Sequence, residues 1–246
     1  MPVSPPVRAS RIVQAIHENR QAVGFHLIFP MVEMIEMMAR EGFDFVYLDG
    51  EHGAFERADI EAACRAAETS GLTVLGRVPR LDDIVIRQYL DSGVQGIVVP
   101  QVSSASEARA AVAATFYAPK GQRSFSSSRS TSFHVEIEDM QRFYEATNAQ
   151  ITLTIQIENR RGLENADEIA AVEGVDYITI GKQDLALDLG LPRLSRGFDP
   201  RLHEAVQLIE AALARHGRRN RDHLMRMGRA RDFMIDGARR YLGRTE

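Results

Sequence analysis

The sequence predicts an α/β fold, a (β/α)8 TIM barrel formed by a single domain over residues 1–246, with an atypical or incomplete C-terminal end. Short apolar runs rich in β-branched residues alternate with segments of helical period, as expected for parallel strands covered by helices. Six strand–helix units follow one another without a glycine-rich dinucleotide fingerprint, which favours a barrel over an open nucleotide-binding sheet. A chain of 246 residues with 44% hydrophobic content can bury one large core.

The predicted elements follow a regular order along the first 215 residues. Strands are assigned to short runs of Val, Ile, Leu, Phe and Tyr, and helices to the amphipathic segments between them. Strands are expected at 23–29, 43–48, 73–78, 96–100, 151–157 and 177–180. Helices are expected at 11–18, 31–40, 57–69, 84–90, 107–116, 163–172 and 201–215.

Two regions interrupt this order. Residues 117–135 are polar and rich in serine, and long segments of this kind are usually lids, binding loops or disordered. Residues 216–246 should contain the seventh and eighth strands, but neither polar stretch there has the character of a buried strand. Closure of the barrel is therefore inferred from the first six units alone.

Composition restricts the class of protein. The single cysteine, Cys64, excludes a disulfide framework and a cysteine-rich zinc site. No signal sequence and no apolar run of about 18 residues is found, which predicts a cytoplasmic protein without a membrane partner. The net charge of −4 gives no reason to expect nucleic acid, and the arginine-rich residues 215–246 are weak evidence for it.

Two carboxylates give the strongest indication of function. Glu158 ends the apolar run at 151–157, and Asp184 follows the run at 177–180. If both runs are consecutive parallel strands, the two acids lie at the carboxyl edge of the sheet, where such folds place their chemistry. Two oxygen ligands with room for water and substrate suit Mg²⁺ or Mn²⁺. The alternative is a helix N-cap and an unrelated surface acid.

Six short motifs together resemble the HpcH/HpaI aldolase family, the metal-dependent (class II) pyruvate aldolases. Each motif lies at the end of a predicted strand or in the loop that follows, and the resemblance covers about residues 22–215. The motifs are Phe-Asp-Phe-Val-Tyr-Leu-Asp-Gly-Glu-His-Gly at 43–53, Arg-Val-Pro at 77–79, Tyr-Leu-Asp-Ser-Gly at 89–93 with Val-Val-Pro at 98–100, Ala-Pro-Lys-Gly-Gln-Arg at 118–123, Gln-Ile-Glu at 156–158 and Ile-Gly-Lys-Gln-Asp-Leu at 180–185.

The resemblance implies a homo-oligomeric barrel of the pyruvate/phosphoenolpyruvate type that acts on a small 2-oxo acid. The implied reaction is cleavage of a 4-hydroxy-2-oxo acid to pyruvate and an aldehyde through an enolate stabilised by a divalent metal. Glu158 and Asp184 match the metal ligands, and the metal would be Mg²⁺ or Mn²⁺, with Co²⁺ as a further candidate. Arg77 matches the arginine that braces the keto oxygen, although an ion pair at the rim would also explain it.

Proton transfer and substrate binding are assigned to the remaining motif residues. His52 is the candidate base, because histidine ordinarily titrates near neutral pH, and Asp49 would orient its ring. Gln156 shares a strand face with Glu158 and would contact substrate or a metal-bound water. Asp91 matches an acid that can reach a neighbouring subunit's site, or is a solvated helix residue. Gly181, Lys182 and Gln183 form the segment that is expected to hold the substrate carboxylate.

Departures from the family pattern leave two alternatives open. Lys182 and Gln183 stand where the family commonly has Pro-Ala, and a lysine there could form a Schiff base, as in class I aldolases. The serine-rich loop and the polar residues 216–246 are also unusual. The second alternative is thus a non-catalytic or degenerate barrel that acts through a partner, because an unclosed parallel sheet exposes an edge.

Overall fold

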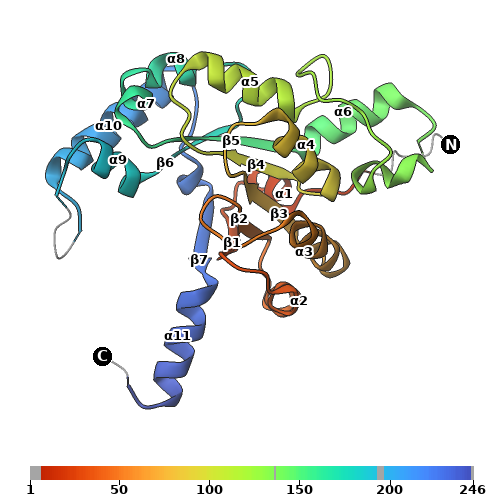
Figure 1. Ribbon diagram of the computed structural model, residues 1–246, viewed down its shortest axis with the longest axis horizontal. Coiled ribbons are helices and arrows are strands. Elements are labelled where there is room, and N and C mark those ends of the chain that lie inside the picture. The colour runs from red at the N-terminus through yellow and green to blue at the C-terminus, as the bar shows by residue number, and fades with distance from the viewer. Residues whose placement is uncertain (1–6, 136, 193–196, 245–246) are drawn as a thin grey trace.

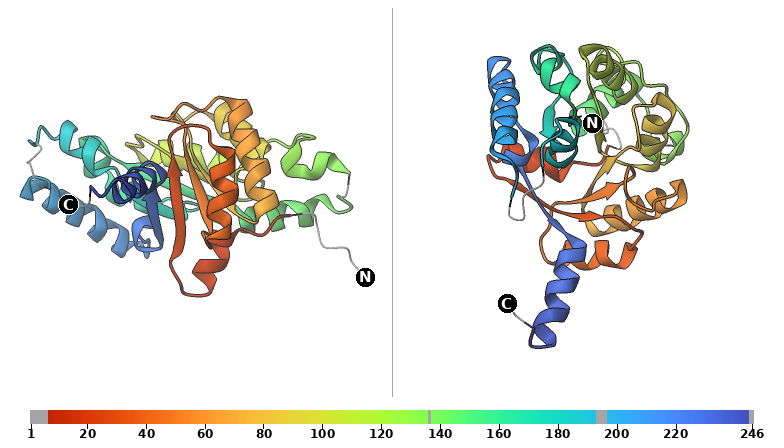
Figure 2. Two further views of the ribbon diagram at one scale, coloured as in Figure 1. Left: turned by 90° about the horizontal axis from the view of Figure 1, so that it is seen from below. Right: turned by 60° about the vertical axis from the view of Figure 1, so that its left-hand side comes forward.

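The computed structural model describes residues 7–135, 137–192 and 197–244 of the chain. A single parallel sheet of seven strands, in the order β6-β5-β4-β3-β2-β1-β7, curls around an apolar interior (Figures 1 and 2). No helix within these ranges is long and apolar enough to span a membrane. The strands are β1 (Ala22–Leu27), β2 (Phe45–Asp49), β3 (Thr73–Arg77), β4 (Gly96–Val99), β5 (Thr152–Ile157), β6 (Tyr177–Ile180) and β7 (Met225–Arg229).

The helices lie mainly on the outer face of the sheet, as Figure 1 shows. They are α1 (Arg11–His17), α2 (Val32–Arg40), α3 (Arg57–Ser70), α4 (Asp83–Ser92), α5 (Ala105–Thr115), α6 (Met140–Gln150), α7 (Arg160–Glu164), α8 (Ala166–Ala170), α9 (Lys182–Asp188), α10 (Pro200–Arg215) and α11 (Ala230–Tyr241). Two short 3-10 helices, η1 (Arg129–His134) and η2 (Arg221–His223), complete the described elements.

The six predicted strands are confirmed, and most of the predicted helices are present with bounds shifted by a few residues. The helix expected at 163–172 is divided into α7 and α8, because Asn165 between them leaves helical geometry at φ −99° and ψ 13°. Helices α6, α9 and α11 were not predicted, and α6 lies directly after the serine-rich stretch.

Residues 216–246 contain one strand, although neither polar stretch has the pattern of a buried strand. β7 lies in this stretch and pairs in parallel with β1 over five residues, from Met225 beside Ala22 to Arg229 beside His26. In β7 only Met225 is buried, and Arg226 and Arg229 are exposed. The strand therefore lacks the apolar run by which the other strands were identified.

Within the described residues the sheet is an incomplete barrel of seven strands. β6 and β7 are its two edges, and between them lies one isolated parallel bridge from Ile178 to Asn220. Thr179 Oγ1 and Asp222 Oδ1, 3.2 Å apart, add a side-chain contact across the same seam. The α/β architecture is thus as expected, while the described strands do not form a closed eight-stranded ring.

The core has two parts, one on each face of the sheet. The larger part fills the space between the sheet and the surrounding helices. The smaller part lies inside the curl, where Phe45, Tyr47, Leu75 and Val98 meet α1, and α1 packs beneath the sheet at the amino ends of the strands. Because side chains alternate along a strand, the same inward positions continue to Asp49 and Arg77 at the carboxyl ends.

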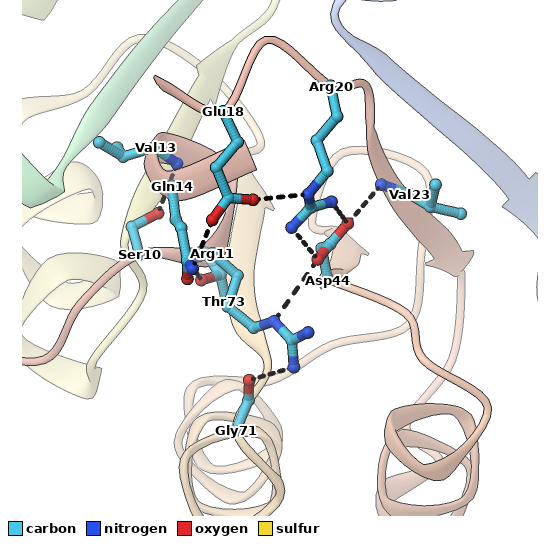
Figure 3. Close-up of polar contacts among 10 residues, drawn as sticks. All are labelled: Ser10, Arg11, Val13, Gln14, Glu18, Arg20, Val23, Asp44, Gly71 and Thr73. Carbon is cyan, nitrogen blue, oxygen red and sulfur yellow. Dashed lines mark hydrogen bonds and ion pairs between the residues drawn. The ribbon is translucent and has the colours of Figure 1, made fainter. Parts of the chain in front are cut away.

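A buried carboxylate fixes the amino end of this curl (Figure 3). Asp44 is 2% exposed and accepts two hydrogen bonds from Arg20, at 2.7 and 3.0 Å, and one from the Val23 amide at 2.9 Å. Arg11 lies 3.5 Å away on the same side. Burial acts to raise the pKa of Asp44, but the hydrogen bonds from Arg20 and Val23 outweigh it and hold the pKa below its ordinary value.

We expect Asp44→Asn to lower the free energy of unfolding by about 2–3 kcal/mol at neutral pH, the range for hydrogen bonds to charged groups, because Arg20 and Val23 lose an ionised acceptor. The depressed pKa makes this stabilisation fully present above the unfolded-state pKa of about 4, and it is lost as the pH falls through the lower folded-state value. Urea denaturation at neutral and acidic pH measures both effects. Glu36→Gln, an exposed change on α2, is the control and should have little effect at either pH.

Candidate active site

A cavity of about 610 Å³ opens at the carboxyl end of the sheet. It brings together residues from β1, β2, β3, β5 and β7 and from the loops that follow them. Eight of the ten predicted site residues line it, namely Asp49, His52, Arg77, Gln156, Gly181, Lys182, Gln183 and Asp184. A site at this end of the strands agrees with the general behaviour of parallel α/β folds.

Asp49 and Arg77 form the rigid part of the site. They are directly opposite in the register of β2 and β3, and they are 1% and 9% exposed. Arg77 donates from Nε and Nη2 to the two Asp49 oxygens at 3.0 and 2.6 Å, and its Nη1 lies 2.8 Å from Glu51. A guanidinium has five N–H groups, so two remain for an oxygen of a ligand in the cavity.

Both members of this pair stay charged at neutral pH. Burial acts to raise the pKa of Asp49, but hydrogen bonds from His26 and Arg77 outweigh it and hold the pKa well below the ordinary range. Burial acts to lower the pKa of Arg77, but Tyr47, Asp49 and Glu51 more than compensate and raise it. Arg77 thus forms an ion pair at the rim of the sheet, and its guanidinium also lies at the wall of the cavity.

The structure places Asp49 against a different histidine ring from the one that was expected. His26 Nε2 lies 3.1 Å from Asp49 Oδ2, whereas His52 meets Asp49 only through its backbone amide at 3.1 Å. The His52 side chain is exposed at the cavity. Asp49 therefore positions the loop that carries His52, and it orients the ring of His26 instead of that of His52.

Glu158 is a buried carboxylate without a cationic partner among the described residues. It is 1% exposed and accepts a hydrogen bond from the Gln101 amide at 2.8 Å and a short one from Gln156 Nε2. Burial raises its pKa to about 7 against these hydrogen bonds, and the charges of Glu51 and Asp184 act in the same direction as burial. Such a carboxylate is poised to be neutralised by a proton or by a bound cation.

Gly181 leaves the space that this carboxylate needs. A Cβ atom at Gly181 would lie 2.2 Å from Glu158 Oε2, too close for any side chain. Asp184, in the first turn of α9, is half-buried at the cavity and makes no ion pair or side-chain hydrogen bond with another described residue. The absence of a side chain at Gly181 therefore leaves space beside the carboxylate of Glu158.

The donor set at this point fits a hard divalent cation. Across the described ranges, no cluster of three or more His, Cys, Asp or Glu side chains is arranged to hold a metal. Glu158 and Asp184 are a pair of neighbouring carboxylates, and Mg²⁺ is commonly held by one or two carboxylates with water and substrate completing its shell. The repulsion between two neighbouring carboxylates is a further reason for a cation between them.

Five lining residues were not predicted from sequence, namely His26, Ile28, Met227, Arg229 and Arg231. The exposed Lys182 lies on the other side of the seam between β6 and β7. His26 could have been found from its inward position near the end of β1, two residues after Gly24. The three residues of the C-terminal stretch had no such signal, because the strand that places them was not recognised.

Two predicted features lie elsewhere in this chain. Asp91 is at the end of α4 and accepts hydrogen bonds from Arg123 at 3.1 Å and Ser126 at 2.9 Å. It lies near the amino ends of the strands, with the serine-rich loop, whose η1 packs on α4. Neither Asp91 nor this loop lines the cavity of its own chain.

The chain is similar to known proteins in sequence and in fold. The 5-keto-4-deoxy-D-glucarate aldolase of Shigella boydii is 32% identical over 213 residues, which are 87% of this chain and 81% of that protein. The crystal structure of an HpcH/HpaI aldolase from Desulfitobacterium hafniense matches the fold with a TM-score of 0.83 at 24% identity, covering 94% of each chain. The citrate lyase β subunit of M. tuberculosis, solved with oxaloacetate and magnesium, has a TM-score of 0.54 at 16% identity over 90% of this chain and 84% of that one. The family model described as HpcH/HpaI aldolase/citrate lyase matches residues 24–239, and the chain belongs to this family.

Proposed function

We propose that the protein is a class II aldolase that cleaves a 4-hydroxy-2-oxo acid to pyruvate and an aldehyde. Family membership supports a carbon–carbon lyase in general terms. The observation that carries the finer proposal is a pair of neighbouring carboxylates, Glu158 and Asp184, without a counter-charge among the described residues. Asp184 lines one cavity with Arg77, which keeps two N–H groups free. This combination provides a cation site and a fixed positive charge at the position where a 2-oxo acid would react.

Glu158 and Asp184 would hold a divalent cation, Mg²⁺, Mn²⁺ or Co²⁺, which when bound would supply Lewis acidity toward the 2-oxo group. The Arg77 guanidinium donates its two remaining N–H groups to the same oxygen. Because Asp49 and Glu51 already fix its orientation, little reorganisation is needed as negative charge develops there. Loss of one such donor typically costs about 100-fold to 1,000-fold in rate.

His52 accepts the proton of the 4-hydroxyl group in this scheme. The C3–C4 bond then breaks, the carbonyl of the aldehyde forms, and the bonding electrons move toward the 2-oxo oxygen beside Arg77. Return of a proton to C3 completes pyruvate. The exposed ring of His52 can reach solvent for this exchange, while its backbone is held by Asp49.

Lys182 and Gln183 are assigned to the carboxylate of the substrate. Both line the cavity at the start of α9, where the first amide groups of the helix have no partner within the helix. An ammonium group and these amides favour an anionic group at that position. Gln156 has a smaller role here than expected, because its side-chain amide already donates to Glu158.

The first test is pyruvate release from several 4-hydroxy-2-oxo acids, with and without EDTA. We expect chelation to abolish activity and added Mn²⁺ or Mg²⁺ to restore it. Glu158→Gln removes a ligand charge and should lower kcat/KM by at least about 100-fold, beyond the 10–100-fold typical of residues that only support ligands. Glu173→Gln, an exposed change, is the matched control. Full activity after thorough chelation would contradict the metal-dependent mechanism.

A non-catalytic barrel is the second candidate function, and the open seam between β6 and β7 favours it. We also infer a homo-oligomer, because Phe233, Met234 and Ile235 are exposed on α11, which extends away from the sheet (Figure 1). Size-exclusion chromatography measures the assembly and is independent of the activity assay.

Metal binding separates the catalytic from the non-catalytic candidate. A cation that binds only the folded protein should raise Tm, with about 2.7 kcal/mol of stabilisation at 100 times Kd. We expect Mn²⁺ to produce this shift, oxalate to add to it and Asp184→Asn to remove it. Equal shifts in the wild type and in Asp184→Asn would show that the cation binds elsewhere, and the absence of any shift would support the non-catalytic candidate.

Lysine chemistry makes a distinct prediction. A Schiff-base lysine needs a deprotonated amine, usually obtained by burial or by a neighbouring cation, whereas Lys182 is exposed. We therefore expect no covalent product after treatment with pyruvate and borohydride, as measured by intact mass. A stable adduct mapped to Lys182 would assign the protein to the class I mechanism.

A further inference from the structure

A second cavity lies at the opposite end of the molecule from the candidate active site. Its volume is about 90 Å³, and its lining includes three arginines, Arg8 from the N-terminal segment and Arg123 and Arg129 from the serine-rich stretch. The cavity is also lined by the turn before β4, at Gly93–Gln95, and by Thr147 of α6.

Three buried polar atoms of this cavity have no hydrogen-bond partner among the described residues. They are Arg8 Nη1, Arg123 Nε and Thr147 Oγ1, from three different segments. The Arg123 side chain is only 1% exposed, so solvent does not satisfy it. Buried donors without partners are rare in folded proteins, and several around one cavity indicate a missing ligand, ion or water.

The cavity also carries more positive than negative charge. Arg123 is paired with Asp91 at 3.1 Å, and Arg129 makes a short contact with Glu68. Arg8 lies 4.0 Å from the same Glu68, so three guanidinium groups face two carboxylates. Burial lowers the pKa of Arg8, and the charge of Arg129 acts in the same direction.

We propose that this cavity is a binding site for a small oxyanion of the phosphate class, either inorganic phosphate or the phosphate group of a monoester. Arg8, Arg123 and Thr147 each supply one free donor, and charge-assisted hydrogen bonds from arginine are well suited to phosphate oxygens. The bound anion joins the N-terminal segment to α4 and α6. The site does not depend on the lyase activity, because none of its residues lines the other cavity.

Isothermal titration calorimetry with inorganic phosphate tests the proposal, with chloride at equal ionic strength as the reference. We expect one phosphate per chain, together with a rise in Tm that chloride does not give. Arg8→Met should weaken phosphate binding by at least about 10-fold, the effect of losing one hydrogen bond between charged groups. Glycerol 3-phosphate is titrated in parallel: equal or tighter binding indicates a monoester as the natural ligand, and exclusion indicates the inorganic ion.

Two further variants make the result decisive. Thr147→Val removes one donor with almost no change in shape, so it tests the site even if Arg8→Met does not fold. Lys182→Gln removes a cation from the other cavity and should leave phosphate affinity unchanged. The proposal is wrong if phosphate gives no effect beyond chloride, or if Lys182→Gln weakens binding while Thr147→Val and Arg8→Met do not.

Discussion

The ion pair between Asp49 and Arg77 is the interaction on which the arrangement of the site depends. Two charged groups are buried here at the ends of adjacent strands, and each is tolerated only because the other is present. Asp49 also accepts hydrogen bonds from the backbone amides of Glu51 and His52, and it contacts the ring of His26. A single carboxylate thus fixes an arginine, a histidine ring and the loop after β2.

Glu158 occupies the contrasting situation on the same sheet edge. It is buried as deeply as Asp49, but its neighbours are two amide groups and other carboxylates. Asp49 has a positively charged partner within the protein, whereas Glu158 has none among the described residues. This difference is the physical reason for proposing a cation site at Glu158 and Asp184, and for proposing that negative charge develops on the 2-oxo oxygen beside Arg77.

Most of the sheet could be predicted from the sequence, because β1 to β6 are short apolar runs buried on both faces. The residues at the carboxyl ends of these strands were also sufficient to predict most of the lining of the cavity. β7 could not be predicted, since Arg226 and Arg229 face solvent and its place beside β1 is set by pairing across about 200 residues. The contact of Asp49 with His26 was missed for a related reason: sequence proximity favoured His52, whereas the strand register brings β1 beside β2.

The sheet is held together less strongly at the seam between β6 and β7 than between its other strands. Six parallel ladders connect the strands from β6 round to β7, while the remaining side is joined through one bridge at Asn220 and a side-chain contact. Local opening at that side breaks few hydrogen bonds and leaves the Asp49–Arg77 pair intact. Lys182 and Arg229 lie on opposite sides of this seam. The distance between them is therefore the dimension of the cavity that changes most easily. Opening at this seam widens the cavity at the wall that carries Lys182 and Arg229, while the wall that carries Asp49 and Arg77 keeps its ion pair.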